Sequence, residues 1–221
     1  MKILITSGGT KEYIDSVRVL TNISTGKLGA LIADTIIYNW PCVNIDTYDL
    51  DINFIYVKGS MLPKYTPINL YEVTDVKSVY ETMRKLVPDM DVVIHPMAVS
   101  DFGFRPSNIK LKSNDPDAFI ESLRERIYKT PKILAKIKEW NPKCFLISFK
   151  FENNLKHDDL ISKAFESMLD NNCDLVIAND KEEMVRNNDH VSYFCRKPDL
   201  TEKVVGKKEI ADKIFEIIHR D

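Results

Sequence analysis

The sequence contains no long apolar run and no excess of charge of either sign. No run of about 18 apolar residues is present, so we expect no membrane span. Met1 and Lys2 lead directly into an apolar segment, so no signal peptide is expected either. The formal net charge is −2, whereas proteins that bind a nucleic-acid backbone are usually basic. We therefore expect a cytoplasmic protein that binds neither membranes nor nucleic acid.

Cysteine and histidine are scarce and show no metal-binding spacing. The sequence has no C-x-x-C pair and no H-x-x-x-H pair, so a zinc site is not predicted. We interpret the four cysteines as reduced, buried thiols, because they are far apart in sequence: Cys42, Cys144, Cys173 and Cys195. The pattern assigns no metal ligand.

The two standard nucleotide-binding fingerprints are also missing. The dinucleotide pattern G-x-G-x-x-G fails because Gly8 and Gly9 are adjacent and the next glycine is Gly26. The P-loop pattern G-x-x-x-x-G-K-[ST] fails because Gly26-Lys27 is followed by Leu28. Any phosphate site must therefore use another arrangement.

The most informative segment present is TSGGTKEYIDSVRVLTNISTGKLG, residues 6–29. It places two turns of small residues around a short polar stretch, between an apolar run typical of a buried strand and a segment with helical spacing. Unpaired backbone N–H groups at a strand-to-helix junction favour a phosphate or carboxylate. The alternative for Gly8 and Gly9 is a tight turn that needs positive φ.

Apolar runs alternate with helical patterns along the chain. Strands are predicted at Lys2–Thr6, Val43–Thr47, Asn53–Val57, Ile68–Val73, Val92–Pro96, Phe145–Phe151 and Leu175–Ala178, and helices at Gly26–Asn39, Asp75–Val87, Pro131–Trp140, Asp158–Asn171 and Lys208–Arg220. Several strands are apolar throughout, as expected when helices cover both faces of a parallel sheet. We predict one α/β domain over residues 1–221, a doubly wound, Rossmann-like and mostly parallel sheet.

Two segments interrupt this alternation. Phe102–Asp117 is rich in Pro, Asn, Ser and Lys and predicts a flexible loop at the carboxyl end of a strand, where open α/β sheets bind ligands. Lys181–Val205 predicts an antiparallel hairpin, with Val191–Arg196 as an edge strand after the Asn187-Asn188-Asp189 turn.

The glycine-rich segment resembles the signature of phosphopantothenoylcysteine synthetase, the ligase of coenzyme A biosynthesis. The matching residues are Gly8, Thr10, Glu12, Asp15, Val17, Arg18, Thr21, Asn22, Ser24, Thr25, Gly26 and Gly29. Four later segments resemble the same family in the same order: residues 91–102, 110–112, 129–134 and 174–180. The chain departs from the family pattern at Met97, at Lys132 and at Phe149–Glu152. Its length leaves no room for a fused decarboxylase, so we expect a stand-alone bacterial type.

The resemblance implies joining of 4'-phosphopantothenate to cysteine through an acyl-cytidylate, with CTP consumed, CMP and pyrophosphate released, and Mg²⁺ on the phosphates. It implies catalytic roles for Asn22 and Lys110. The implied nucleotide-binding residues are Gly8, Gly9, Thr10, Met97, Ala98, Asp101, Lys110, Phe149, Asn179 and Asp180. The implied substrate-binding residues are Arg18, Asn22, Ser24, Thr25, Gly26 and Ala98.

Each of these residues also has a structural interpretation. Asn22 is a suitable helix cap, Arg18 is close enough in sequence to pair with Asp15, and Asp101 is a suitable loop cap. Lys110 and Lys112 fit a solvated loop, and Phe149 fits a core. Asn179 and Asp180 follow a strand, with no assigned contact.

Two other functions stay open at this point. A Rossmann-type NAD(P)-dependent oxidoreductase would need an acid after the second strand, which Asp46 or Asp49 would supply. A non-catalytic nucleotide-binding regulator would explain the departures at Met97 and Lys132. The family resemblance further implies a homodimer with shared active sites, in which we expect Arg18 to reach the neighbouring subunit.

Overall fold

The computed structural model describes residues 1–43, 50–112, 114–197 and 200–220. In this part of the chain an eight-stranded sheet has the order β12-β11-β10-β9-β6-β1-β4-β5. Six strands run parallel, namely β1 (Lys2–Ser7), β4 (Asp51–Val57), β5 (Asn69–Val73), β6 (Val92–His95), β9 (Phe145–Glu152) and β10 (Leu175–Asp180). β11 (Val191–Lys197) is antiparallel to both β10 and β12 (Leu200–Val205). The predicted doubly wound, mostly parallel α/β fold is confirmed.

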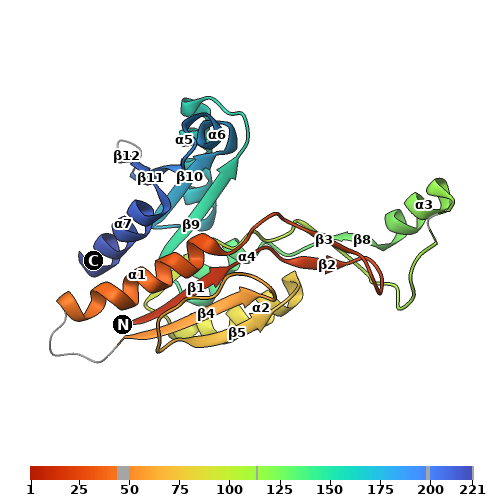
Figure 1. Ribbon diagram of the computed structural model, residues 1–221, viewed down its shortest axis with the longest axis horizontal. Helices are drawn as coiled ribbons and strands as arrows, with labels where there is room; N and C mark the ends of the chain where they lie inside the picture. The colour runs from red at the N-terminus through yellow and green to blue at the C-terminus, as the bar shows by residue number, and fades with distance from the viewer. Residues whose placement is uncertain (44–49, 113, 198–199, 221) are drawn as a thin grey trace.

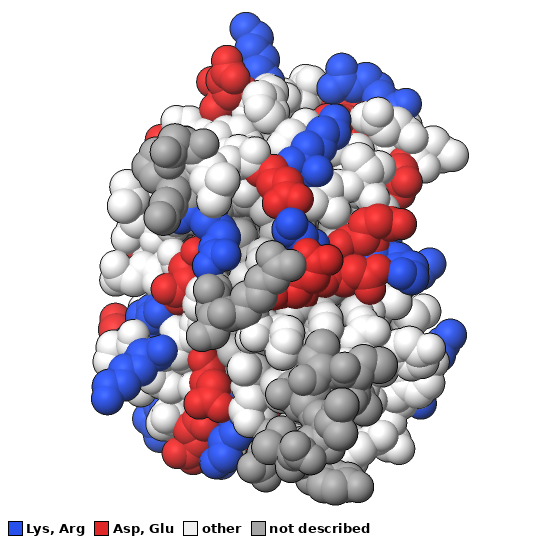
Figure 2. All heavy atoms as spheres, turned by 90° about the vertical axis from the view of Figure 1, so that its left-hand side faces the viewer, with Lys and Arg blue, Asp and Glu red and all other residues white. Residues whose placement is uncertain are grey.

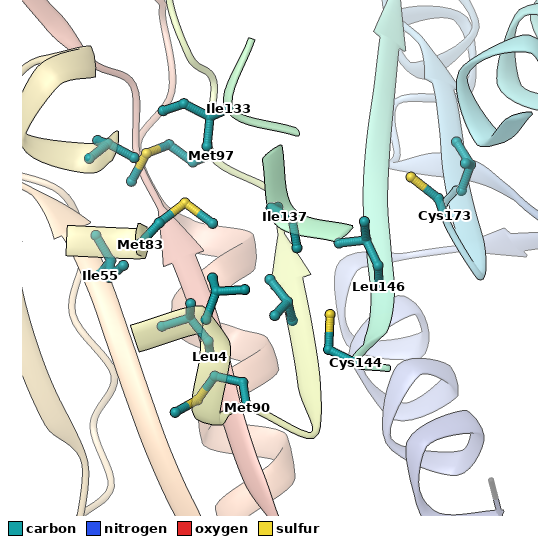
Figure 3. Close-up of a cluster of buried hydrophobic side chains, with 14 of the residues drawn as sticks. Leu4, Ile55, Met83, Met90, Met97, Ile133, Ile137, Cys144, Leu146 and Cys173 are labelled. Carbon is teal, nitrogen blue, oxygen red and sulfur yellow. The ribbon is translucent and has the colours of Figure 1, made fainter. Parts of the chain in front are cut away.

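Helices cover both faces of this sheet (Figure 1). α1 (Lys27–Val43) and α7 (Lys207–Arg220) contribute to one core, and α2 (Val76–Leu86), α4 (Ile133–Trp140) and α5 (His157–Asn171) contribute to the other. Leu4 of β1 faces the second core, whereas Ile3 and Ile5 face the first. Figure 3 shows Leu4 among the side chains of the second core. This double burial explains why several strands contain continuous apolar runs, such as Ile3–Ile5 and Val92–Ile94.

The order of the strands creates a topological switch point. From β1 the chain moves outward through β4 and β5, and it then returns to the opposite side of β1 to form β6. In open α/β sheets ligands bind outside the carboxyl ends of the strands at such a point. The fold therefore predicts a ligand site at the segments that follow β1 and β6.

A long projection, which we call the arm, extends away from the sheet (Figure 1). It consists of residues 11–21 and 102–129. Its strands are β2 (Lys11–Tyr13) paired with β3 (Val19–Thr21) and β7 (Phe102–Phe104) paired with β8 (Ile127–Lys129), and its far end carries α3 (Pro116–Arg126). The four strands were not predicted from the sequence, because three-residue strands are too short to show a period. The helix α3 was not predicted either.

Three other predictions need correction. The expected loop Phe102–Asp117 begins with β7 and ends in the first turn of α3. In the expected hairpin, Lys181–Asn187 forms the helix α6, and the edge strand is β12, since β11 lies inside the sheet. The expected strand Val43–Thr47 is wrong at Val43, which ends α1, and its other residues lie outside the described part of the chain.

Charges of both signs are mixed on the face opposite the arm (Figure 2). This mixture agrees with the small net charge. Among the described helices, none has the length and apolar character needed to cross a membrane.

Candidate active site

Two chain turns are joined at the switch point. The Ala98 N–H donates to the Gly8 carbonyl at 2.9 Å, and the Thr10 N–H donates to the Ala98 carbonyl at 3.1 Å. Gly8 has φ of +91°, and a Cβ there would lie 2.1 Å from Ser60 Oγ, so only glycine fits. The Thr10 hydroxyl accepts from the Ser100 N–H at 3.0 Å and is fully buried. These residues fix the segments after β1 and β6 against each other.

Asn22 lies directly over this junction. A Cβ on Gly9 would be 2.5 Å from the Asn22 carbonyl oxygen, so the bare glycine lets the two backbones touch. The Asn22 side chain is exposed and forms no hydrogen bond with a described residue. Thr25, not Asn22, accepts from an N–H at the start of α1, that of Lys27, at 3.4 Å. The Asn22 amide is therefore not used as a helix cap and is available to a ligand.

Ser24, Thr25 and Gly26 form the turn that leads into α1. Ser7 Oγ donates to the Gly26 carbonyl at 3.0 Å, and the Met61 N–H donates to the Thr25 carbonyl at 2.9 Å. These bonds hold the amino end of α1 beside the carboxyl end of β1. The amino end of a helix favours an anion, because its first N–H groups lack partners within the helix.

A cleft of about 1100 Å³ opens at the carboxyl edge of the sheet, between the segment after β6 and the helices α4 and α5. Five residues predicted from the sequence line it: Asn22, Met97, Ala98, Asp101 and Phe149. The structure thus brings together residues that are up to 127 positions apart (149 − 22). This size suits a nucleotide-sized ligand.

The cleft also contains polar residues that sequence reasoning missed. They include His95, Ser148, Lys150, Lys163 and Lys181. His95 and Ser148 could have been identified from the sequence, because each is a polar residue in a buried strand. The lysines could not, since an isolated lysine in a sequence resembles ordinary solvated surface.

Charged groups gather at the rim of the cleft. Lys132 forms an ion pair with Asp101, so the residue that departs from the family pattern contacts a family residue. Lys150 and Lys163 lie 3.0 and 3.5 Å from the Glu152 carboxylate. Burial alone would raise the pKa of Glu152, but these two lysines outweigh burial and hold it below its ordinary value. The rim is therefore a set of paired charges that a ligand can rearrange.

Asn179 and Asp180, at the end of β10, are not among the residues that line the cleft. Asp180 caps α6, since its carboxylate accepts from the N–H groups of Glu182 and Glu183 at 3.0 and 3.2 Å. Asn179 Nδ2 lies 3.1 Å from His190 Nε2. Their implied contact with a nucleotide remains a prediction.

Arg18 and Lys110 lie in the arm, outside the lining of the cleft. Arg18 Nη1 donates to Asp15 Oδ2 at 3.1 Å and to the Leu111 carbonyl at 3.2 Å. The salt bridge weighed as the alternative for Arg18 is therefore present within this chain. Lys110 is exposed in the loop next to Leu111, whose N–H donates to Asp15 at 3.0 Å.

The described residues contain no group of three or more His, Cys, Asp or Glu side chains that could hold a metal ion. A resident metal centre therefore does not fit the part of the chain that the structure describes.

Comparison with known proteins gives a consistent result. A family model described as the DNA/pantothenate metabolism flavoprotein C-terminal domain matches residues 1–220. The crystal structure of the DNA/pantothenate metabolism flavoprotein from Streptococcus pneumoniae is 32% identical, with a TM-score of 0.81, and the match covers 100% of this chain and 99% of that one. A Cab2 variant in complex with phosphopantothenate-cysteine has a TM-score of 0.76 at 20% identity over 99% of this chain and 85% of that one, which shows the shared fold.

Two curated relatives are named coenzyme A biosynthesis bifunctional protein CoaBC. The one from Methanocaldococcus jannaschii is 30% identical over 220 residues, and the one from Thermococcus kodakarensis is 31% identical over 224 residues. The match covers 99% of this chain but 50% and 51% of these relatives, so the chain spans about half their length. The chain therefore belongs to the family of the DNA/pantothenate metabolism flavoprotein C-terminal domain, and its resemblance to phosphopantothenoylcysteine synthetases is confirmed.

Proposed function

We propose that this protein joins the carboxylate of 4'-phosphopantothenate to the amine of cysteine, with CTP as the energy source. The observation that carries this proposal is the position of Asn22, which lines a cleft at the switch point and whose amide forms no hydrogen bond with a described residue. The family match over residues 1–220 and the relatives named for coenzyme A biosynthesis support the same reaction.

The reaction requires activation of a poor electrophile. A carboxylate oxygen of phosphopantothenate attacks the α-phosphorus of CTP, and the bond to the β-phosphate breaks, which releases pyrophosphate. The cysteine ammonium loses one proton to solvent, and the resulting amine attacks the acyl carbon. CMP leaves, and the nitrogen loses a second proton to solvent to give the amide. The protein needs no nucleophile of its own and acts by positioning and charge compensation.

Asn22 acts at the acyl centre in this proposal. Its amide donates a hydrogen bond to the acyl oxygen as negative charge develops there, which is worth on the order of 3 kcal/mol in the transition state. The turn at Ser24, Thr25 and Gly26 and the amino end of α1 hold an anionic part of the substrates nearby. Ala98 contributes to the binding of both substrates.

The nucleotide occupies the cleft. Met97, Asp101 and Phe149 line it, and Lys110 reaches the triphosphate from the arm loop. Mg²⁺ accompanies the triphosphate as part of the substrate complex. Gly8 and Gly9 contribute by allowing the close approach of chain segments described above.

The working unit in this proposal is a homodimer formed through the arm. Apolar side chains on the arm are exposed in the single chain, including Val17, Leu20, Phe102, Ile120 and Ile127. Such a group of exposed apolar residues on a thin projection favours coverage by a second copy. Arg18 lies on this projection, and in this proposal its guanidinium binds the phosphate of a substrate held by the partner.

A single assay tests the reaction. Purified protein receives phosphopantothenate, cysteine and Mg²⁺ with CTP or ATP, and pyrophosphate is measured. We expect release that requires both the acid and the nucleotide and is faster with CTP. Equal or faster turnover with ATP would reject CTP preference, and no release with any nucleotide would reject the ligase.

A mixing experiment tests the shared site. Chains carrying Arg18→Ala are exchanged with chains carrying Asn22→Asp, so that some mixed dimers keep one intact site if Arg18 acts across the interface. Recovery of activity supports this arrangement. A monomer in sedimentation, or a dimer without recovery, would reject it.

The two alternative functions give different results in simple measurements. An oxidoreductase would bind NAD(P), with its near-ultraviolet absorbance, but the candidate acids Asp46 and Asp49 lie outside the described residues. A non-catalytic regulator would bind CTP without releasing pyrophosphate.

A further inference from the structure

Three polar side chains form a row across the centre of the sheet. His95 of β6 is the register partner of Ser148 of β9, and on its other side His95 Nδ1 lies 2.8 Å from Thr6 Oγ1 of β1. Their exposed fractions are 0% for Thr6, 7% for His95 and 1% for Ser148. The preceding residues of these strands are apolar, so this row begins the polar floor of the cleft.

The His95 ring is a neutral donor. Burial lowers its pKa to about 4, so it carries no charge at pH 7. The Met97 N–H donates to Thr6 Oγ1 at 3.4 Å, which leaves the Thr6 hydroxyl proton free to point at His95 Nδ1. We therefore assign the ring proton to Nε2. Among the described residues, Nε2 has no hydrogen-bond partner, although His95 lines the cleft.

The Ser148 hydroxyl is also unsatisfied. It is buried, it lines the cleft, and it has no hydrogen-bond partner of good geometry among the described residues. A weak contact with the Cys173 thiol does not replace one. A buried hydroxyl without a hydrogen-bond partner lowers the stability of a protein unless water or a ligand supplies that bond. Two neighbouring groups in the cleft, His95 Nε2 and the Ser148 hydroxyl, can therefore each form a hydrogen bond with a polar ligand.

The chemistry of the floor differs from that of the rim. The row carries no formal charge, whereas Lys132, Asp101 and Lys150 lie at the rim. The row offers no cation of its own to a phosphate or carboxylate, and the cleft lysines Lys132, Lys150 and Lys163 are already paired with Asp101 and Glu152. Met97 and Ile133, which lie side by side in Figure 3, supply buried apolar walls. A neutral planar ring with polar atoms on its edge fits this space.

We propose that His95 and Ser148 bind the polar edge of the nucleobase of the nucleotide substrate, with Thr6 as the residue that positions His95. This inference rests on the proposed nucleotide-dependent function. It makes the row a determinant of which base is accepted, because a fixed N–H donor beside a rotating hydroxyl favours a particular order of acceptor and donor on the base.

Binding measurements on variants test this inference. Wild type, Ser148→Ala and His95→Leu are titrated by calorimetry with CTP, UTP and inorganic triphosphate. We expect CTP to bind about tenfold more weakly to each variant, which is the loss of one hydrogen bond to a base. The CTP-to-UTP affinity ratio should move toward one. Affinity for inorganic triphosphate should stay unchanged, because the phosphates do not touch the row.

Two further variants serve as controls. His95→Gln keeps a neutral N–H donor and should recover part of the CTP affinity. Ser192→Ala removes a hydroxyl that is equally buried and unpartnered among the described residues, but that lies on β11 and outside the lining of the cleft. It should bind all three ligands like wild type. Since Ser148→Ala removes one unpaired oxygen, it should fold even if His95→Leu does not.

The outcomes separate the two levels of the proposal. Unchanged CTP affinity and base preference in Ser148→Ala would overturn the role of the row. An equal loss of affinity for inorganic triphosphate would overturn it as well, since the defect would not concern the base. A wild-type protein that binds no nucleoside triphosphate would overturn the proposed function, and with it this inference.

Discussion

The sheet and the arm are stabilised in different ways. In β1, Leu4 and its neighbours Ile3 and Ile5 are completely buried under helices on both faces. In the arm, by contrast, Leu20 is 42% exposed and no residue of α3 is buried. What fixes the base of the arm is polar, because the Glu12 carboxylate accepts from the Val76 N–H at the start of α2 at 2.9 Å.

The polar organisation of the arm centres on a buried carboxylate. Asp15 accepts hydrogen bonds from the N–H groups of Val17, Arg18 and Leu111 at 2.8 to 3.0 Å. One side chain therefore connects the turn between β2 and β3 to the loop that carries Lys110. Hydrophobic burial makes the sheet stable by itself, whereas the arm combines polar fixation with exposed apolar surface.

The largest expected effect is a loss of stability, which we compare between one leucine of the sheet and one of the arm. Leu4→Ala should lower the free energy of unfolding by about 2–5 kcal/mol, because it leaves a cavity in a closed core. Leu20→Ala should lower it by only about 0.5 kcal/mol in the monomer. Urea unfolding measures both values. Sedimentation should show weaker self-association for Leu20→Ala alone. Equal losses of unfolding free energy in the two variants would contradict the difference in stabilisation between sheet and arm.

The next effect concerns chemistry at the junction of the two regions. Asn22→Asp should reduce ligation at least a hundredfold, because it replaces a donor with a negative charge beside a developing oxyanion. Its melting temperature should stay near that of wild type, since the side chain is exposed and forms no hydrogen bond with a described residue. Pyrophosphate release and thermal unfolding measure the two properties. Asn153→Asp, another exposed asparagine outside the cleft lining, is the control and should keep full activity.

A third prediction concerns the pH dependence of the arm. Burial by itself would raise the pKa of Asp15, but the N–H groups of Val17, Leu111 and Arg18 together with the Arg18 guanidinium hold it below its ordinary value. Its stabilising contribution is therefore complete above the unfolded pKa of about 3.9 and is lost as the pH falls through the folded value.

We therefore expect faster amide hydrogen exchange at Val17 and Leu111 below about pH 4, after correction for intrinsic rates, with little change in β1. Asp15→Asn should exchange faster than wild type near neutral pH and should show a weaker dependence on pH. Identical pH profiles for the two proteins would show that Asp15 does not hold the arm.

The smallest expected effect separates two lysines of the arm loop. Lys110→Gln should raise the KM for CTP several-fold, because a charge placed at a phosphate is worth more than a solvated one. Lys112→Gln, also exposed, should change it little. Steady-state kinetics at varied CTP measures both. A larger effect at Lys112 would exchange the roles of the two residues.

Sequence patterns predicted the central parallel strands because they contain apolar runs that are buried on both faces. Val92–Pro96 and Leu175–Ala178 were placed to within two residues of β6 and β10. The strands of the arm were missed because strands of three residues are too short to show a pattern. In the same way α6 was missed, because its cap at Asp180 is a single residue at the end of a strand.

The sequence by itself determined the fold class, the family and the candidate Asn22, because these depend on local patterns and on residues in a fixed order. Only the tertiary structure decided which of the candidates share a cleft, since that depends on the strand order that places β1 beside β6 and β9. It also separated Asn22, whose side chain forms no hydrogen bond with a described residue, from Asp180, whose carboxylate caps a helix. A residue type specifies what a side chain can bind, but its neighbours in the folded protein decide whether its hydrogen-bonding groups are still available to a ligand.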